Sequence, residues 1–147
     1  MLDPDCVWQW LQGCPNVHDL FFRYGRVEAG DALLAPVDGG ETAQRRFLNG
    51  AEERRSRFGL VRFAQAPDAP NEPDAMAAQR DLDAIAAWIE AQERAARYPA
   101  LPEGCTALAA GVLSAESRAL SQPAGIGRYA LTFYIDYLYE PEDEISG

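Results

Sequence analysis

Few residues of this sequence could perform catalytic chemistry. His18 is the single histidine, so a Ser-His-Asp or Cys-His arrangement would have to use it. It lies beside Asp19, and no G-x-S-x-G motif occurs in the chain. Acidic residues do occur in close pairs, such as Glu52–Glu53 and Asp81–Asp83, and paired carboxylates can act as general acid and base. Charged surfaces explain these pairs more simply, so we expect a structural His18 and no enzymatic activity.

Motifs for metals and cofactors are also missing. One histidine and three cysteines, none of them in a C-x-x-C pair, suggest neither a zinc site nor a disulfide framework. The chain has no lysine, which rules out a P-loop. The pair of glycines around Ile126 lacks the third glycine of a dinucleotide-binding motif. We therefore expect no cofactor and no metal, and we interpret Cys6, Cys14 and Cys105 as small apolar residues of the core.

Positive charge is concentrated in one segment of the chain. Six of the thirteen basic residues, all arginines, fall within residues 45–62, against only two glutamates. This stretch carries +4, while the net charge of the whole chain is −10. The arginines are Arg45, Arg46, Arg54, Arg55, Arg57 and Arg62.

Two interpretations of the arginine cluster compete. It is either a solvated hairpin with internal salt bridges, each worth at most about 1 kcal/mol, or a basic hairpin that meets an acidic surface of a partner or of an identical neighbour. A role in nucleic-acid binding is a weaker third interpretation, because the acidic total disfavours phosphate neutralisation. We expect no sequence-specific nucleic-acid binding.

The elements that position these residues begin with two helices. Asp3 is suited to cap a short N-terminal helix, and Pro4 to occupy its first position. Residues 74–96 form the second predicted helix, in which Leu82, Ile85 and Ile89 share one apolar face.

Six strands are predicted from alternation and turn residues, at residues 19–24, 31–37, 42–48, 58–64, 107–115 and 128–140. The first two have hairpin-like spacing, and Asp38-Gly39-Gly40 predicts a turn. Asn49-Gly50 begins a longer charged connection, which predicts a hairpin with a projecting tip.

The predicted fold is a single α+β domain over residues 1–147. It has a largely antiparallel mixed sheet of about six strands with two helices packed on one face, in the order α-β-β-β-β-α-β-β. A Pro-rich loop at 67–73 and a flexible acidic tail at 141–147 complete it. No stretch is apolar enough to cross a membrane, and the acidic N-terminus does not resemble a signal peptide, so we expect the chain to begin in the cytosol.

Several short stretches, in this order and spacing, resemble a family of small phage tail proteins. The family comprises tail terminator or tail-completion proteins, often labelled minor capsid proteins in prophages of Gram-positive bacteria. The stretches are VWQWLQGCP at 7–15, RRFLNG at 45–50, RFGL at 57–60, WIEAQ at 88–92 and GRYALTFYIDY at 127–137.

The resemblance implies a structural role without a cofactor. The subunits would form a ring, commonly a hexamer, at the head-proximal end of a long tail. That ring would stop polymerisation of the tail tube and provide the surface that joins tail to head. The implied partners are other copies of the chain, the tail tube protein and a head-completion or connector protein. The protein would occupy the host cytoplasm during assembly and the virion tail afterwards.

For such a ring, we expect the hairpin from Arg45 to Arg62 and one sheet edge to form the subunit contact, with Phe47 and Phe58 flanking the hairpin base. Replacing the arginines at 54, 55 and 57 with serine should then weaken assembly while the monomer stays folded. The alternative function is a small acidic cytosolic binding module, such as an immunity or antitoxin-like protein, whose acidic surface neutralises a basic partner.

Overall fold

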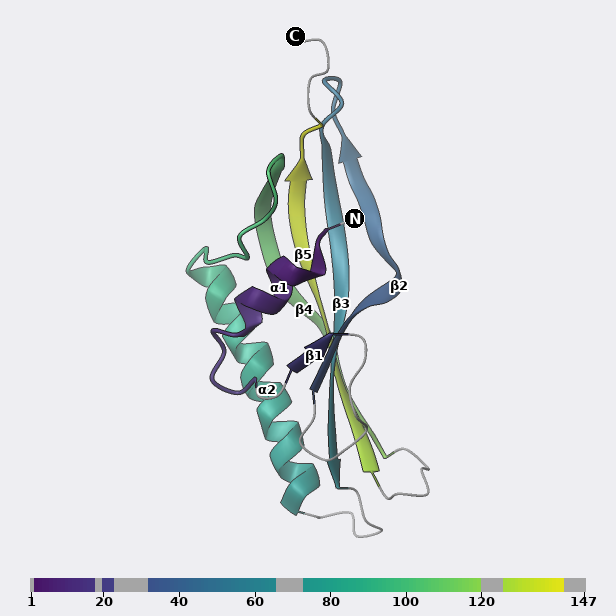
Figure 1. Ribbon diagram of the computed structural model, residues 1–147, viewed down its shortest axis with the longest axis vertical. Helices are drawn as coiled ribbons and strands as arrows, with labels where there is room; N and C mark the ends of the chain where they lie inside the picture. The colour runs from purple at the N-terminus through teal and green to yellow at the C-terminus, as the bar shows by residue number, and fades with distance from the viewer. Residues whose placement is uncertain (1, 18–19, 23–31, 66–72, 120–125, 142–147) are drawn as a thin grey trace.

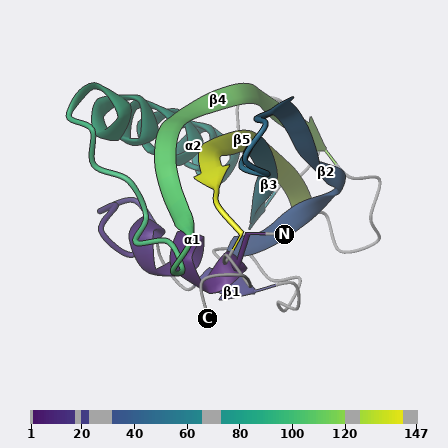
Figure 2. The same ribbon diagram turned by 90° about the horizontal axis from the view of Figure 1, so that it is seen from above.

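The computed structural model describes residues 2–17, 20–22, 32–65, 73–119 and 126–141 (Figure 1). Its elements are α1 (Pro4–Leu11), β1 (Leu20–Phe22), β2 (Ala32–Arg46), β3 (Glu52–Gln65), α2 (Pro73–Arg94), β4 (Cys105–Ala119) and β5 (Ile126–Tyr139). The predicted α+β class is confirmed. Both helices lie to one side of a curved sheet, as the view along the strands in Figure 2 makes clear. His18, most of the predicted loop at 67–73 and nearly all of the tail at 141–147 lie outside the described residues.

Within the described residues, the sheet has five strands in the order β1-β2-β3-β5-β4. The ladders β2–β3, β3–β5 and β4–β5 are antiparallel. The three residues of β1 pair with Ala32–Leu34 of β2 in the parallel direction, so the predicted hairpin of 19–24 with 31–37 is wrong. A parallel pair requires the chain to return to the same end of the sheet, and no tight turn can do that.

The prediction of separate strands at 31–37 and 42–48 is also wrong, because both belong to β2. Pro36 pairs with Phe58 and Glu41 with Ser56, so residues 37–40 of β2 stand opposite the single residue Arg57 of β3. The two glycines that predicted a turn therefore lie in an irregularity of the ladder. Glycine suits a bulge as well as a turn, and here the chain bends without reversing.

The β2–β3 connection is much shorter than predicted. Phe47 N–H donates to Ala51 O at 2.9 Å, and Gly50 N–H donates to Phe47 O at 3.0 Å. The loop is thus three residues long, with Gly50 at φ +88° supplying the left-handed conformation that such loops require. There is no projecting tip, because the charged residues after Ala51 are themselves β3.

The core lies between the helices and one face of the sheet. Alternation along β5 points Leu131, Phe133, Ile135 and Tyr137 to that face, and all four are buried. Phe133 lies at the centre, with its ring 5.7 Å from that of Phe58 on β3.

Both helices contribute the apolar faces that the sequence predicts. Leu82, Ile85 and Ile89 of α2 are buried against the sheet. Asp3 caps α1, its Oδ1 accepting from Asp5 N–H at 3.0 Å. Trp10 joins the two helices: its ring lies 5.0 Å from that of Trp88, and its Nε1 donates to Arg97 O at 3.1 Å.

Candidate functional site

On the sheet face opposite the helices, Arg55 of β3 is held by β5. Its Nε donates to Asp136 Oδ1 at 2.8 Å and its Nη2 to Oδ2 at 3.0 Å, a bidentate ion pair between directly paired residues. The hydrogen bond to Asp136 raises the pKa of Arg55. Its guanidinium also stacks 3.8 Å from the ring centre of Tyr134. These contacts make Arg55 part of the folded sheet.

We predict that Asp136→Ala lowers the free energy of unfolding by about 1.5–3 kcal/mol, because Arg55 loses two charge-assisted hydrogen bonds. Urea denaturation of the purified variant measures the change. Glu53→Ala is the matched control, since its pair with Arg45 is 3.9 Å long and the Arg45 side chain is 68% exposed. That control should change stability by less than about 1 kcal/mol. Equal losses in the two variants would contradict the prediction.

The position of the Tyr134 ring, on which Arg55 stacks, requires a glycine in the neighbouring strand. Gly111 of β4 pairs with Tyr134, and a Cβ built at Gly111 would lie 2.5 Å from the Tyr134 hydroxyl oxygen. The ring therefore occupies the space above the β4 backbone, and any side chain at this position would displace it. The small residues of β4 thus serve packing within the chain at this point.

A polar cluster interrupts the helix-side face of the sheet. The Tyr137 hydroxyl donates to Glu41 Oε1, while Glu41 Oε2 is buried without a hydrogen-bond partner. Arg54 lies next to Tyr137 in the ladder, donates to Glu52 Oε2 at 3.0 Å, and stacks 4.2 Å from the Tyr139 ring centre. Burial, followed by the hydrogen bond to Glu41, raises the pKa of Tyr137 well above 10.

The cysteines offer no reactive site. Cys14 is buried and Cys6 and Cys105 are half-buried, and all three are free thiols. Burial is the main cause that raises the pKa of each one, which keeps the unreactive thiol form at neutral pH. Within the described ranges, no three histidine, cysteine or acidic side chains come together in a way that could hold a metal ion.

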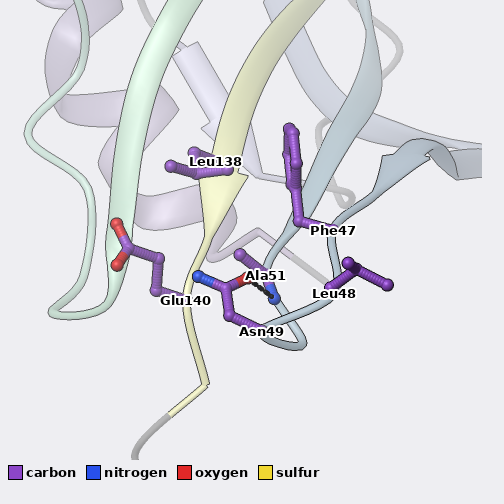
Figure 3. A pocket seen from close by; sticks show the side chains of 6 residues that line it. All are labelled: Phe47, Leu48, Asn49, Ala51, Leu138 and Glu140. Atoms are coloured by element: carbon purple, nitrogen blue, oxygen red, sulfur yellow. Dashed lines mark hydrogen bonds between the residues drawn. The ribbon is translucent and has the colours of Figure 1, made fainter.

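The end of the β2–β3 hairpin has a different character. Arg45 and Arg46 are 68% and 77% exposed, and their pairs with Glu53 and Glu52 are long, at 3.9 and 3.8 Å. Leu48 is fully exposed. It occupies the first position of the three-residue loop, and Figure 3 shows it pointing away from Leu138 of β5. The cations and the apolar side chain are thus both available for contact.

A shallow open hollow of about 580 Å³ lies beside this loop (Figure 3). Its lining is mainly apolar, from Phe47, Leu48 and Ala51 on the hairpin side and Leu138 on β5, with Asn49 and Glu140 at the rim. Asn49 Oδ1 accepts from Ala51 N–H at 3.0 Å, so the asparagine that signals the turn also fixes its shape.

The structure separates the predicted contact residues into two groups. Arg45, Arg46 and Phe47 lie exposed at the hairpin end. Arg54 and Arg55 are bound within the fold, as the salt-bridge interpretation expects. We therefore expect serine at these two positions to weaken the sheet as well as any contact between copies.

The other three predicted residues lie elsewhere. Phe58 is in the core, not at the base of the hairpin, because its β3 position faces the helices. Arg57 is half-buried and makes no ion pair with any residue that the structure describes. The side chain of Arg62 lies outside the described part; its backbone pairs with Ala32 and Tyr129.

Sequence reasoning missed three exposed leucines. Leu48 stands directly before Asn49-Gly50, so the predicted turn could have identified it as exposed. Leu108 and Leu113 of β4 are also exposed, and each occupies a point where the β4–β5 register shifts. In a strand of mostly small residues, a bulge does not visibly change the alternation of apolar and polar residues. The sequence therefore carries no signal that Leu108 and Leu113 are exposed.

Comparison with solved structures gives a similarity over almost the whole chain. A chain from a solved structure titled "Virion of native gene transfer agent (GTA) particle" matches 90% of this chain and 91% of its own length, with a TM-score of 0.56 and 16% sequence identity. The two chains share a fold along almost their whole lengths. No protein-family model and no curated protein matches the sequence. In the part that the structure describes, no helix is long and apolar enough to cross a membrane.

Proposed function

We propose that this chain is a structural subunit of a phage-like particle. The observation that carries the proposal is the shared fold with a chain of a gene transfer agent virion, which extends over nine-tenths of both chains. Similarity of that extent concerns the whole subunit, not a common supersecondary motif. The arginines of the hairpin fit this role, because Arg55 is held within the sheet while Arg45 and Arg46 lie exposed at the hairpin end.

Within that class, we propose the role of tail terminator or tail-completion protein. Copies of the chain would form a ring that ends polymerisation of the tail tube and presents the surface for head joining. The partners would be the neighbouring copies, the tail tube protein and a head-completion protein. The resemblance of the short sequence stretches supports this finer role. The protein would act in the host cytoplasm during assembly and remain in the particle afterwards.

Deleting the gene in its host tests this proposal, with electron microscopy of the particles as the readout. We expect free heads and tail tubes of uncontrolled length, and we expect expression of the intact chain from a plasmid to restore joined particles. Normal particles in the deletion strain would contradict the proposal. Recovery of the tagged chain in a complex with one basic host protein, and in no particle, would instead support the acidic binding module.

A further inference from the structure

We propose that the β2–β3 hairpin end of one copy docks on the beginning of β4 of the next copy. This inference rests on the proposed ring and specifies its contact. The docking residues are Arg45, Arg46 and Leu48 on one side, and Glu103 and Leu108 on the other. Four observations support it. The two surfaces lie on opposite open edges of the sheet, they lie at the same level along the strands, and their side chains are complementary. In addition, a hydrogen bond to α2 blocks strand pairing farther along β4.

The first observation is that the two surfaces lie on opposite edges of the sheet. β4 is the last of the described strands on one side. On the other side β1 covers only Ala32–Leu34, so the remainder of β2 has no further strand beside it among the described residues. Each copy therefore offers two different edges. Contact between unlike surfaces is heterologous, and it closes into a ring when the rotation between copies divides a full turn.

The second observation is that the two surfaces lie at the same height. Following the ladders across the sheet gives the row Arg45, Glu53, Leu138 and Thr106. A ring whose axis runs along the strands relates neighbours by rotation without any shift along that axis. Its contacting surfaces must therefore share one level. The hairpin end and the beginning of β4 satisfy this condition.

The third observation is that the surfaces are complementary in charge and polarity. One edge presents two exposed guanidinium groups and the fully exposed Leu48. The opposite edge presents the exposed carboxylate of Glu103, two residues before β4, and Leu108, which is 41% exposed. Arginine pairs with carboxylates in a fixed geometry, and burial of two leucines favours association.

The fourth observation limits the contact to the beginning of β4. Glu93 of α2 reaches the edge of β4, where its Oε2 accepts from Ala110 N–H at 2.7 Å. That backbone donor is therefore occupied, and the register shift at Leu108 further interrupts the strand. Continuous strand pairing with another copy is blocked beyond this point. Docking through side chains at the first residues of β4 remains open.

Charge reversal with rescue tests the contact. Light scattering after size exclusion, from micromolar to near-millimolar protein, measures the association constant between copies. We expect Arg46→Glu and Glu103→Arg each to lower it at least about tenfold, equivalent to about 1.4 kcal/mol. The double variant should recover to within about threefold of wild type, because the pair is restored with its charges exchanged. High salt should weaken the wild type and the double variant alike.

Two further variants separate docking from folding. Leu48→Ser should lower association about tenfold while leaving the unfolding transition unchanged, because the side chain contacts solvent in the single copy. Arg80→Glu makes the same change of charge as Arg46→Glu at an exposed position of α2 that is not one of the docking residues, and this variant should associate as wild type.

Three results would overturn the inference: wild-type association of the reversal variants, no recovery in the double variant, or a wild type that stays monomeric at near-millimolar concentration. None of them decides the proposed function. The deletion experiment tests that function separately, because a terminator ring could be held by other surfaces or by the tail tube.

Discussion

Replacing Phe133 with alanine is expected to lower the free energy of unfolding by about 3–5 kcal/mol. Phe133 is buried in the middle of β5, where its ring lies 5.7 Å from Phe58 and 6.4 Å from Trp10. It therefore links two strands and the N-terminal helix, and its removal leaves a cavity bounded by ring faces that cannot all close in. Urea denaturation followed by tryptophan fluorescence measures the loss, since Trp10 reports on the same site.

Leu108→Ala is the control for Phe133→Ala. It removes an apolar side chain from the same sheet at a position that is already partly exposed. Its loss should stay below about 1 kcal/mol, in keeping with surface positions generally. A loss below about 1 kcal/mol at Phe133 would mean that the helices and the sheet do not share one core.

Removing the Tyr137 hydroxyl is also expected to destabilise the fold. Tyr137→Phe leaves the partly buried Glu41 carboxylate without its hydrogen-bond donor, and its other oxygen already has none. An unsatisfied buried polar group costs about 1–3 kcal/mol. Thermal and urea unfolding at pH 7 should therefore both show a less stable variant. Tyr134→Phe, which removes a hydroxyl from the opposite face, is the control and should change stability by less than about 0.5 kcal/mol.

Tyr137 also gives the protein a dependence on alkaline pH. Burial and the hydrogen bond to Glu41 raise the pKa of Tyr137 in the folded protein above its usual value of 10. The unfolded chain thus releases this proton first, and stability falls as pH rises above about 10, by at most ~1.4 kcal/mol per pH unit from this group. In Tyr137→Phe this contribution is missing, so the alkaline decline should be shallower. A decline as steep as that of wild type would place its origin elsewhere.

The sequence predicts the fold best where one face of an element is apolar and the other is not. The stripe of Leu82, Ile85 and Ile89 and the alternation of β5 identify their elements and their buried faces correctly. The prediction is wrong along β2 and the first half of β3. In that region both faces of the sheet carry charged side chains. The neighbouring residues Arg54 and Arg55, for example, point to opposite faces. The alternation of apolar and polar residues that marks a strand is therefore absent.

The candidate contact was predictable in part for a similar reason. A run of arginines predicts a basic hairpin, and that hairpin exists. Which arginines are available depends on partners far away in sequence, such as Asp136, 81 residues from Arg55. Asn49-Gly50 identifies the turn, and the position of Leu48 directly before it was a signal of exposure that sequence reasoning missed. The exposure of Leu108 results from a register shift between β4 and β5. Such a shift depends on how two strands pair and cannot be predicted from one of them.

The hydrogen bond from Ala110 N–H to Glu93 has a consequence for the aggregation of the free chain. At high protein concentration, open strand edges promote pairing between chains and amyloid-like stacking. The Glu93 carboxylate occupies one backbone donor on the edge of β4, so another chain cannot pair continuously along this strand. This protection lasts only while α2 is packed on the sheet, so loosening of this helix would expose the β4 edge to other chains.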